Sequence, residues 1–491
     1  MKKYLFFLSA VSIAMFTACS SEEDLADAPK TMTQEEYNAI VAEATSPSDV
    51  QIRLGMGSQA SSVTRAPLES DADGFFTTPT SSDPGGAQYL GIYCLAQQNQ
   101  TTSGTLPVGS VATGSISWVT PVSDDARETA KFFLMKNNQA ARVVKLAAGD
   151  KIGDVTLTGP ACEVQFMNDD LSSAKTYYYP YGNWYNYHFY GYYPRQTTGI
   201  TEAADKITVN YTINGTQDII HGTAKPVDAA DLTTGFNAKY IRRLQSENHY
   251  DLDHLPAMAM EHKLTQVRFW VKTTSSNYDT YGYGTGSGQK KFQITSLKLT
   301  QVPTNWTLTV ADKSATGNTE GQLLPQSNIG LGDITPKYME LLGDGKTSDA
   351  TQTSNAEGLP TAKDIEQTTK LIGYAMIPTT EMMGNSAITI PERTDKTVPY
   401  FDFTISYTDA SNNPSTFEFK NQKIDMPRAA GNDGILGTSD DVIQDFEPGK
   451  VYNVIIDIPV PEEIDMSATL EQWVTVTVTE TSSQNINITV D

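Results

Sequence analysis

The sequence has few of the residues that metal and thiol chemistry requires. Only 3 cysteines and 5 histidines occur among its 491 residues. Cys94 and Cys162 each lie in an apolar, strand-like run, so they form either one disulfide in an oxidising compartment or two buried thiols. His249, His254 and His262 are close in sequence, but their spacing matches no compact zinc motif. The sequence therefore predicts no metal centre built from these side chains.

Positive charge is also scarce. Lysine and arginine number 35 against 58 aspartates and glutamates, which gives a formal net charge of -23. Such an acidic chain is a poor ligand for nucleic acid and for anionic lipid surfaces. There is no Gly-x-Ser-x-Gly element, and the glycine-rich YGYGTGSGQKK lacks the Gly-Lys-Ser/Thr ending of a phosphate loop. We therefore expect a protein without enzymatic activity and without a bound cofactor.

Long apolar runs are confined to the N-terminus. Residues 1–18 contain two lysines and then LFFLSAVSIAMF, and Thr17-Ala18-Cys19 follows, which is the pattern of a lipoprotein signal peptide. Cys19 would then be the first mature residue, with a lipid on its thiol and an acylated amine. The alternative is an ordinary secretory signal with an incidental cysteine. No later run approaches the roughly 20 apolar residues of a spanning helix, so lipid alone would anchor the mature chain.

Strand-like periodicity dominates the rest of the chain. Examples are YLGIYCLA, KITVNYTI, TQVRFWVK and VYNVIIDI, whereas the clearest helical pattern is TQEEYNAIVAEA near the N-terminus. Many short strands with irregular connections predict an all-β fold built from β-sandwiches. The polar stretch RRLQSENHYDLDHLP marks a boundary between two predicted domains, residues 66–255 and 256–480.

A single arginine stands in a polar linker near the N-terminus. Within SSVTRAP, Arg65 is the only arginine between Arg53 and Arg127. A guanidinium is permanently charged and fits a carboxylate-lined specificity pocket, and the serines and threonine around it favour an exposed, extended loop. The bond between Arg65 and Ala66 is therefore a candidate for an arginine-specific protease. The alternative is an unprocessed linker.

Two segments at opposite ends of the chain share one pattern of alternation. Before Arg65, the side chains of Ile52, Leu54 and Met56 would face one side of a strand. Near the C-terminus, Ile486, Ile488 and Val490 alternate with polar residues in the same way. The terminal segment could therefore present the same apolar face as the early strand, or it could pair within its own sheet.

The order of these landmarks resembles that of a known family. They are the lipobox at Cys19, QIRLGM, VTRA, LGIYCLA, FYGYYP, MEHKLTQVRFWVK, LIGYAMIP, EPGKVYNVIIDI and LEQW. No single motif is specific, but the ordered set spans essentially the whole chain. It resembles the fimbrillin family, the lipoprotein precursors of type V pilus subunits.

The resemblance implies a fold and an assembly route. It implies two tandem transthyretin-like β-sandwich domains after a pro-segment, residues 19–65, that holds a helix and the first strand. The precursor would be exposed on the cell outer membrane, and a gingipain-like, arginine-specific protease would cut after Arg65 and remove that strand. The C-terminal segment of another subunit, residues 481–491, would replace it in an extracellular fimbrium that supports adhesion. Its partners would be other pilus subunits and a host or bacterial surface receptor.

Other functions remain open on the sequence. A tip subunit need not donate a strand, and an anchor subunit would keep its lipid and resist cleavage. A surface glycan-binding lipoprotein could stack sugars on the tyrosine-rich block from Tyr177 to Pro194. Such a block also supplies core strands in many proteins, and the family resemblance favours that interpretation.

One acidic loop has the side chains of a calcium ligand set. GNDGILGTSDD places oxygen ligands close together around glycine turns, at Asn432, Asp433, Asp440 and Asp441. It lacks EF-hand spacing and a terminal glutamate. A solvated hairpin tip is the alternative, and the favoured prediction is that no metal is bound.

Overall fold

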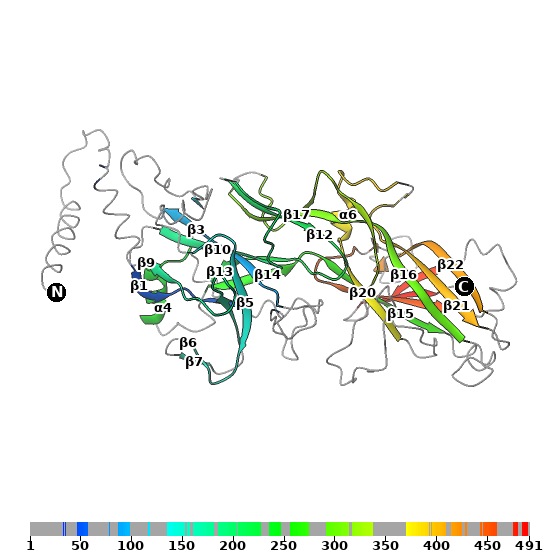
Figure 1. Ribbon diagram of the computed structural model, residues 1–491, viewed down its shortest axis with the longest axis horizontal. Coiled ribbons are helices and arrows are strands. Elements are labelled where there is room, and N and C mark those ends of the chain that lie inside the picture. The colour runs from blue at the N-terminus through cyan, green and yellow to red at the C-terminus, as the bar shows by residue number, and fades with distance from the viewer. Residues whose placement is uncertain are drawn as a thin grey trace.

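The computed structural model is an elongated, mostly β molecule (Figure 1). It describes residues 33, 35, 47–56, 78, 87–98, 116–117, 135–152, 155–157, 161–180, 185–203, 205–226, 235–246, 256–273, 291–313, 317–336, 370–391, 393, 395–408, 414–424, 428–429, 442–443, 445–458, 475–479 and 484–489. In this part of the chain no helix is long and apolar enough to cross a bilayer. The predicted all-β class is confirmed, and the tandem transthyretin-like sandwiches stay a prediction.

The first half of the chain forms a sheet that closes on itself, which we call the barrel sheet. Its strands, in hydrogen-bonded order, are β10 (Tyr185–Tyr193), β13 (Ile220–Lys225), β14 (Ala257–His262), β2 (Leu54–Met56), β8 (Ala161–Phe166), β5 (Gln139–Leu146) and β3 (Leu90–Gln98). β3 then pairs antiparallel with β10 and completes the ring. The short β4 (Ile116–Ser117) pairs with the other end of β3. The ring removes most of the free edge that an open sheet would have, although β2 pairs with only Ala257 and Met258 of β14.

Alternation along β3 and β10 buries both of their faces. Ile92 and Cys94 belong to one hydrophobic core, the first core, which lies within the barrel sheet. Tyr93 and Leu95 belong to the other, the second core, which continues into the second half of the chain. Successive side chains of a strand point to opposite faces, so a run such as LGIYCLA serves both cores.

A second sheet, the junction sheet, takes a hairpin from each half of the chain. Its strands are β11 (Ile200–Glu202), β12 (Lys206–Thr212), β17 (Asn305–Asp312) and β18 (Leu323–Pro325). β12 pairs antiparallel with β17 across the predicted domain boundary. β14 also belongs to the barrel sheet, so the chain leaves that sheet only after His262, later than the predicted boundary between 255 and 256.

The second half of the chain contributes two further sheets. One has the order β20 (Lys370–Ile377), β15 (Thr265–Thr273), β25 (Val451–Ile458), β27 (Gln484–Thr489) and β26 (Thr475–Thr479). The other has the order β19 (Leu331–Ile334), β16 (Lys291–Pro303), β21 (Tyr400–Thr408) and β22 (Pro414–Lys423). Phe269 of β15 lies 5.6 Å from Phe401 of β21 between ring centroids, so the second core joins the two sheets.

Shorter elements complete the described fold. They are β1 (Pro47–Gln51) paired with β9 (Tyr178–Pro180), β6 (Lys151–Ile152) with β7 (Val155–Thr156), β23 (Arg428–Ala429) with β24 (Val442–Ile443), and the helices α4 (Ala238–Ser246) and α6 (Thr380–Gly384). Asn237 caps α4 by accepting a hydrogen bond from the Tyr240 amide at 2.9 Å. The apolar face of α4, with Ile241 and Leu244, packs into the first core.

Candidate functional site: the strand that closes the barrel

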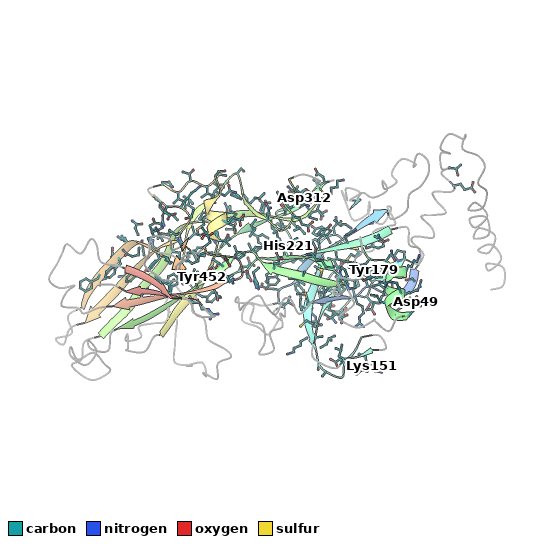
Figure 2. The ribbon with its side chains drawn as sticks, turned by 180° about the vertical axis from the view of Figure 1, so that it is seen from behind. Asp49, Lys151, Tyr179, His221, Asp312 and Tyr452 are labelled. Carbon is teal, nitrogen blue, oxygen red and sulfur yellow. The ribbon has the colours of Figure 1, made fainter. Side chains whose placement is uncertain are left out.

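Residues 47–56, the N-terminal ribbon, lie in the wall of the barrel sheet. β2 runs parallel to β14 and antiparallel to β8, and no pairing between β8 and β14 themselves occurs among the described strands. β1 continues the ribbon along β9 at the end of the molecule, where Figure 2 shows Asp49 and Tyr179 close to α4. The ribbon is therefore the segment that closes the ring.

The apolar residues of the ribbon point into the first core. Ile52 is 2% exposed, Leu54 0% and Met56 6%. Their burial contributes about 1.5 to 3 kcal/mol each before entropy costs. The backbone is bound on both sides, because Ile52 N donates to Tyr177 O at 2.8 Å and Gly55 N to Pro256 O at 2.9 Å. The ribbon is thus a fully integrated part of the barrel.

The outward side of the ribbon, at the residue before β2, carries a shielded ion pair. Arg53 Nε donates to Glu163 Oε1 at 2.7 Å and Arg53 Nη2 to Glu163 Oε2 at 3.2 Å, with both side chains only 14% exposed. Gly55 lies directly opposite Glu163 and has no side chain, so Arg53 reaches the carboxylate diagonally. Bidentate geometry makes this a strong, orientation-specific contact. Sequence reasoning missed it because its partners are 110 positions apart.

A second ion pair holds the ribbon from outside. Arg242 of α4 donates to Asp49 of β1 at 2.8 Å, and the hydrogen bond to Arg242 lowers the pKa of Asp49. The Asp49 side chain is 88% exposed. Water and salt screen such a pair, so it contributes much less than the Arg53 contact.

The tyrosine-rich block next to the ribbon supplies the core. Tyr179, Tyr187 and Phe189 are each at most 1% exposed and pack against one another in the first core. The Tyr177 hydroxyl donates to Gln139 Oε1 at 2.6 Å, and burial raises the pKa of this phenol. Tyr178, at 49%, is the one strongly exposed ring among the block's described residues. These buried rings offer no stacking surface for a sugar.

The C-terminal segment pairs within its own chain. β27 runs parallel to β25 and antiparallel to β26, with Ile486 opposite Val454 and Val478 and Ile488 opposite Ile456 and Val476. β26 forms the edge of this sheet. The hairpin of β26 and β27 could therefore detach without breaking any pairing of β15 or β20.

Several sequence-predicted residues lie outside the described residues. They are Cys19, Arg65, Ala66, Val490, Asn432, Asp433, Asp440 and Asp441. Lipidation, processing and calcium binding at these positions stay predictions. Among the described residues, no group of His, Cys, Asp and Glu could hold a metal ion. Cys94 and Cys162 are buried thiols in β3 and β8 and are not joined by a disulfide.

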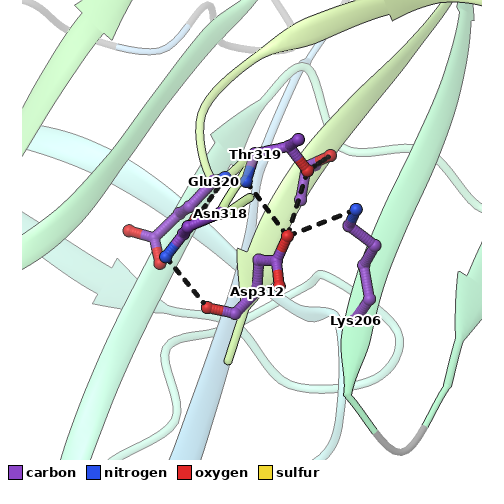
Figure 3. Close-up of polar contacts among 6 residues, drawn as sticks. Lys206, Asp312, Asn318, Thr319 and Glu320 are labelled. Carbon is purple, nitrogen blue, oxygen red and sulfur yellow. Dashed lines mark hydrogen bonds and ion pairs between the residues drawn. The ribbon is translucent and has the colours of Figure 1, made fainter. Parts of the chain in front are cut away.

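A polar cluster at the junction sheet was not anticipated from the sequence. Asp312, whose side chain is fully buried, accepts hydrogen bonds from the Thr319 amide and hydroxyl at 3.0 Å each and pairs with Lys206 at 3.2 Å (Figure 3). Burial and the nearby charge of Asp312 raise the pKa of Glu320 to about 7. These contacts hold the turn between β17 and β18, so we assign the cluster a structural role.

A buried histidine joins the barrel to the junction sheet. His221 of β13 lies between the two halves in Figure 2, and its Nε2 is 2.8 Å from Val310 O of β17. Burial lowers the pKa of His221 to about 4, so the neutral ring donates this hydrogen bond at physiological pH. The barrel and the second half are thus tied by a polar contact as well as by β12 and β17.

No family model and no curated protein matches this sequence. The solved structures similar to it include cell adhesion and fimbrial proteins. A candidate cell adhesion protein from Bacteroides uniformis has 10% identity and a TM-score of 0.31, covering 91% of this chain and 98% of its own. A fimbrilin, FimA, from Porphyromonas gingivalis has 9% identity and a TM-score of 0.23, covering 71% and 88%. The fimbrial anchor protein Mfa2 from Porphyromonas gingivalis has 7% identity and a TM-score of 0.18, covering 70% and 79%.

Proposed function

We propose that this protein is a structural subunit of a surface fimbria. It is exported as an outer-membrane lipoprotein anchored through Cys19, and an arginine-specific protease cuts it after Arg65. The N-terminal ribbon then leaves the barrel sheet. The C-terminal strand of a second copy takes its place, and repetition of this step builds a fibre that supports adhesion.

The observation that carries the proposal is the position of β2. It is a short strand that closes a ring between β8 and β14, and it lies only nine residues before Arg65. While the chain is intact, the ribbon has an effective concentration on the order of millimolar, which a second subunit in dilute solution cannot match. A cut after Arg65 removes that advantage and leaves two unpaired strand edges, to which an extended segment can bind by strand addition.

The C-terminal segment is a suitable replacement. The alternation of Ile486, Ile488 and Val490 with polar residues matches that of Ile52, Leu54 and Met56. Because β26 and β27 form the outer part of their sheet, they can leave it while the second core is retained. The space that the ribbon leaves between β8 and β14 is called the groove below. A tip subunit would accept a strand in this groove without donating one, and an anchor subunit would retain its ribbon.

The test is processing followed by assembly. A chain beginning at Ser20 is incubated with an arginine-specific protease, and its new N-terminus and its oligomer size are measured. We expect Ala66 as the new N-terminus and a ladder of assembled subunits. Arg65→Ala should abolish both, whereas Arg127→Ala, at the next arginine along the chain, should leave both unchanged.

A truncated chain distinguishes the role of the donated strand from the role of the site that accepts it. A variant lacking residues 484–491 should form no ladder alone but should enter ladders as a terminal subunit when it is mixed with the full-length chain. Ladders formed by the truncated chain alone would rule out the proposed donor strand. A full-length chain that is cut after Arg65 but keeps its ribbon and stays monomeric would rule out the exchange.

A further inference from the structure

The Arg53–Glu163 ion pair distinguishes the ribbon from its proposed replacement. Glu163 lies in the middle of β8, where its directly opposite neighbours are Gly55 of β2 and Val144 of β5. Neither neighbour carries a charge. The guanidinium of Arg53, which binds both carboxylate oxygens, is therefore the counter-charge that the ribbon itself brings to this position.

The C-terminal segment has no cation to offer in its place. In the sequence QNINITVD, residues 484–491, Ile486, Ile488 and Val490 would face the first core. The outward positions are then held by neutral residues, such as Asn487, and the terminal Asp491 is acidic. A shift of register by two residues keeps the same apolar face inward and leaves the outward face without a positive charge.

We infer that Glu163 is a specificity-determining residue of the groove, which favours the chain's own ribbon over the C-terminal strand of a second copy. This inference rests on the proposed function. The ion pair lowers the rate at which the uncut ribbon leaves, and it is lost when a neutral strand enters. When the guanidinium leaves, the Glu163 carboxylate stays shielded from water but loses the charge interaction that offset the cost of that shielding. The groove is therefore selective for the ribbon sequence, both in the intact precursor and against a competing strand after the cut.

The first experiment measures opening of the ribbon in the intact chain. Cys162 lies opposite Met56 of β2 on one side and Lys145 of β5 on the other and is 2% exposed, so a thiol reagent can modify it only when the barrel opens beside β8. In a chain beginning at Ser20 with Cys94→Ala, Cys162 is the remaining thiol. We expect Arg53→Gln to raise its labelling rate by about tenfold, a typical effect of a shielded bidentate pair. Combining Arg53→Gln with Glu163→Gln should bring the labelling rate most of the way back to its original value, because no unpaired charge is left.

A neighbouring pair provides the matched control. Arg142 of β5 donates to Gln165 of β8 at 2.7 Å, also on the barrel surface, but its acceptor is a neutral amide. Arg142→Gln should change the labelling rate less than twofold. An equal effect of Arg142→Gln and Arg53→Gln would show that any loss of a barrel arginine loosens β2, and the inference would be wrong.

The second experiment measures selectivity in the cut chain. After cleavage at Arg65, synthetic peptides of residues 47–56 and 484–491 compete for the groove, and bound peptide is quantified by fluorescence anisotropy. We expect Glu163→Gln to shift the competition toward the C-terminal peptide by about tenfold, and higher salt to shift it in the same direction. On the chain that keeps Glu163, a ribbon peptide carrying Arg53→Gln should lose its advantage over the C-terminal peptide. On the Glu163→Gln chain, the same change in the peptide should have no effect.

The outcomes separate this inference from the proposed function. If the C-terminal peptide enters the groove but Glu163→Gln leaves the ratio unchanged, Glu163 does not determine specificity and strand exchange stands. If neither peptide binds any cut variant, the groove itself is absent and the proposed function fails with it.

Discussion

β2 and β15 each join two neighbouring strands, but they are held in different ways. β2 has three residues, of which all three pair with β8 and two, Gly55 and Met56, pair with β14. β15 has nine residues, with β20 on one side and β25 on the other. A short strand in a closed ring depends mainly on its inward side chains, whereas a long central strand also depends on many backbone pairs. We therefore expect β2 to separate from the barrel as a unit, whereas separation of β15 should require unfolding of the sheet around it.

The largest effect is expected from a change in β15. Phe269 is fully buried and packs against Phe401, so Phe269→Ala should lower the free energy of unfolding by about 3 to 5 kcal/mol. Chemical denaturation of the full chain measures this. Phe417→Ala, on the edge strand β22 and only partly buried, is the control and should cost less. Equal losses would contradict the central role of β15.

The next effect concerns β2. Leu54→Ala removes a fully buried side chain and should cost about 2 to 4 kcal/mol, with hydrogen exchange accelerated in β2, β8 and β14 but not in β15 or β25. Hydrogen exchange with mass spectrometry measures this pattern. Leu331→Ala, at a leucine that is 40% exposed, should leave exchange in the barrel unchanged. Uniform acceleration across both halves would mean that β2 does not open locally.

A smaller, pH-dependent effect on stability is expected from Glu320, in the junction sheet region between β2 and β15. Because the pKa of Glu320 is raised to about 7 in the folded protein, its stabilising contribution is present below its ordinary pKa and is lost as the pH rises through 7. Glu320→Gln should therefore stabilise the protein at pH 8, by on the order of 1 kcal/mol after solvent screening, and give no gain at pH 4. Thermal unfolding at both pH values measures this. Lys225 and Lys263 also act on Glu320 and oppose Asp312, so Lys263→Gln should enlarge the difference.

The smallest effect is expected at the exposed end of the ribbon. Asp49→Asn breaks the ion pair with Arg242, but the carboxylate is largely in water, so the unfolding midpoint should not move measurably at physiological salt. Differential scanning calorimetry is sufficient for this test. A clear loss of stability would show that β1, and not only β2, holds the ribbon in the barrel.

Local patterns in the sequence were sufficient to predict many strands. VYNVIIDI is β25, KITVNYT is β12, and the alternation of Ile52, Leu54 and Met56 corresponds to three side chains buried in one core. These predictions succeed because the side-chain period of a strand is a local property. The helix α4 was missed, although Asn237 followed by the spacing of Ile241 and Leu244 is a recognisable cap and apolar face.

Partners far apart in sequence could not be predicted. Nothing near Arg53 indicates that it binds Glu163, and nothing in AMAMEH indicates that β14 runs parallel to β2 and belongs to the barrel sheet. The polar cluster of Asp312 has the same origin, because Lys206 and Thr319 approach it from different strands and turns. Such contacts follow from the topology, which local residue patterns constrain only weakly.

The pairing of β12 with β17 has a consequence for the stiffness of the subunit, and so of the proposed fibre. Each half of the chain donates a strand to the junction sheet, and His221 adds a hydrogen bond across the same region. Bending one half against the other would have to break these pairs or distort the second core. The subunit should therefore behave as one rigid body and not as two domains joined by a flexible linker. Curvature in a fibre of such subunits would then concentrate at the contacts between neighbours.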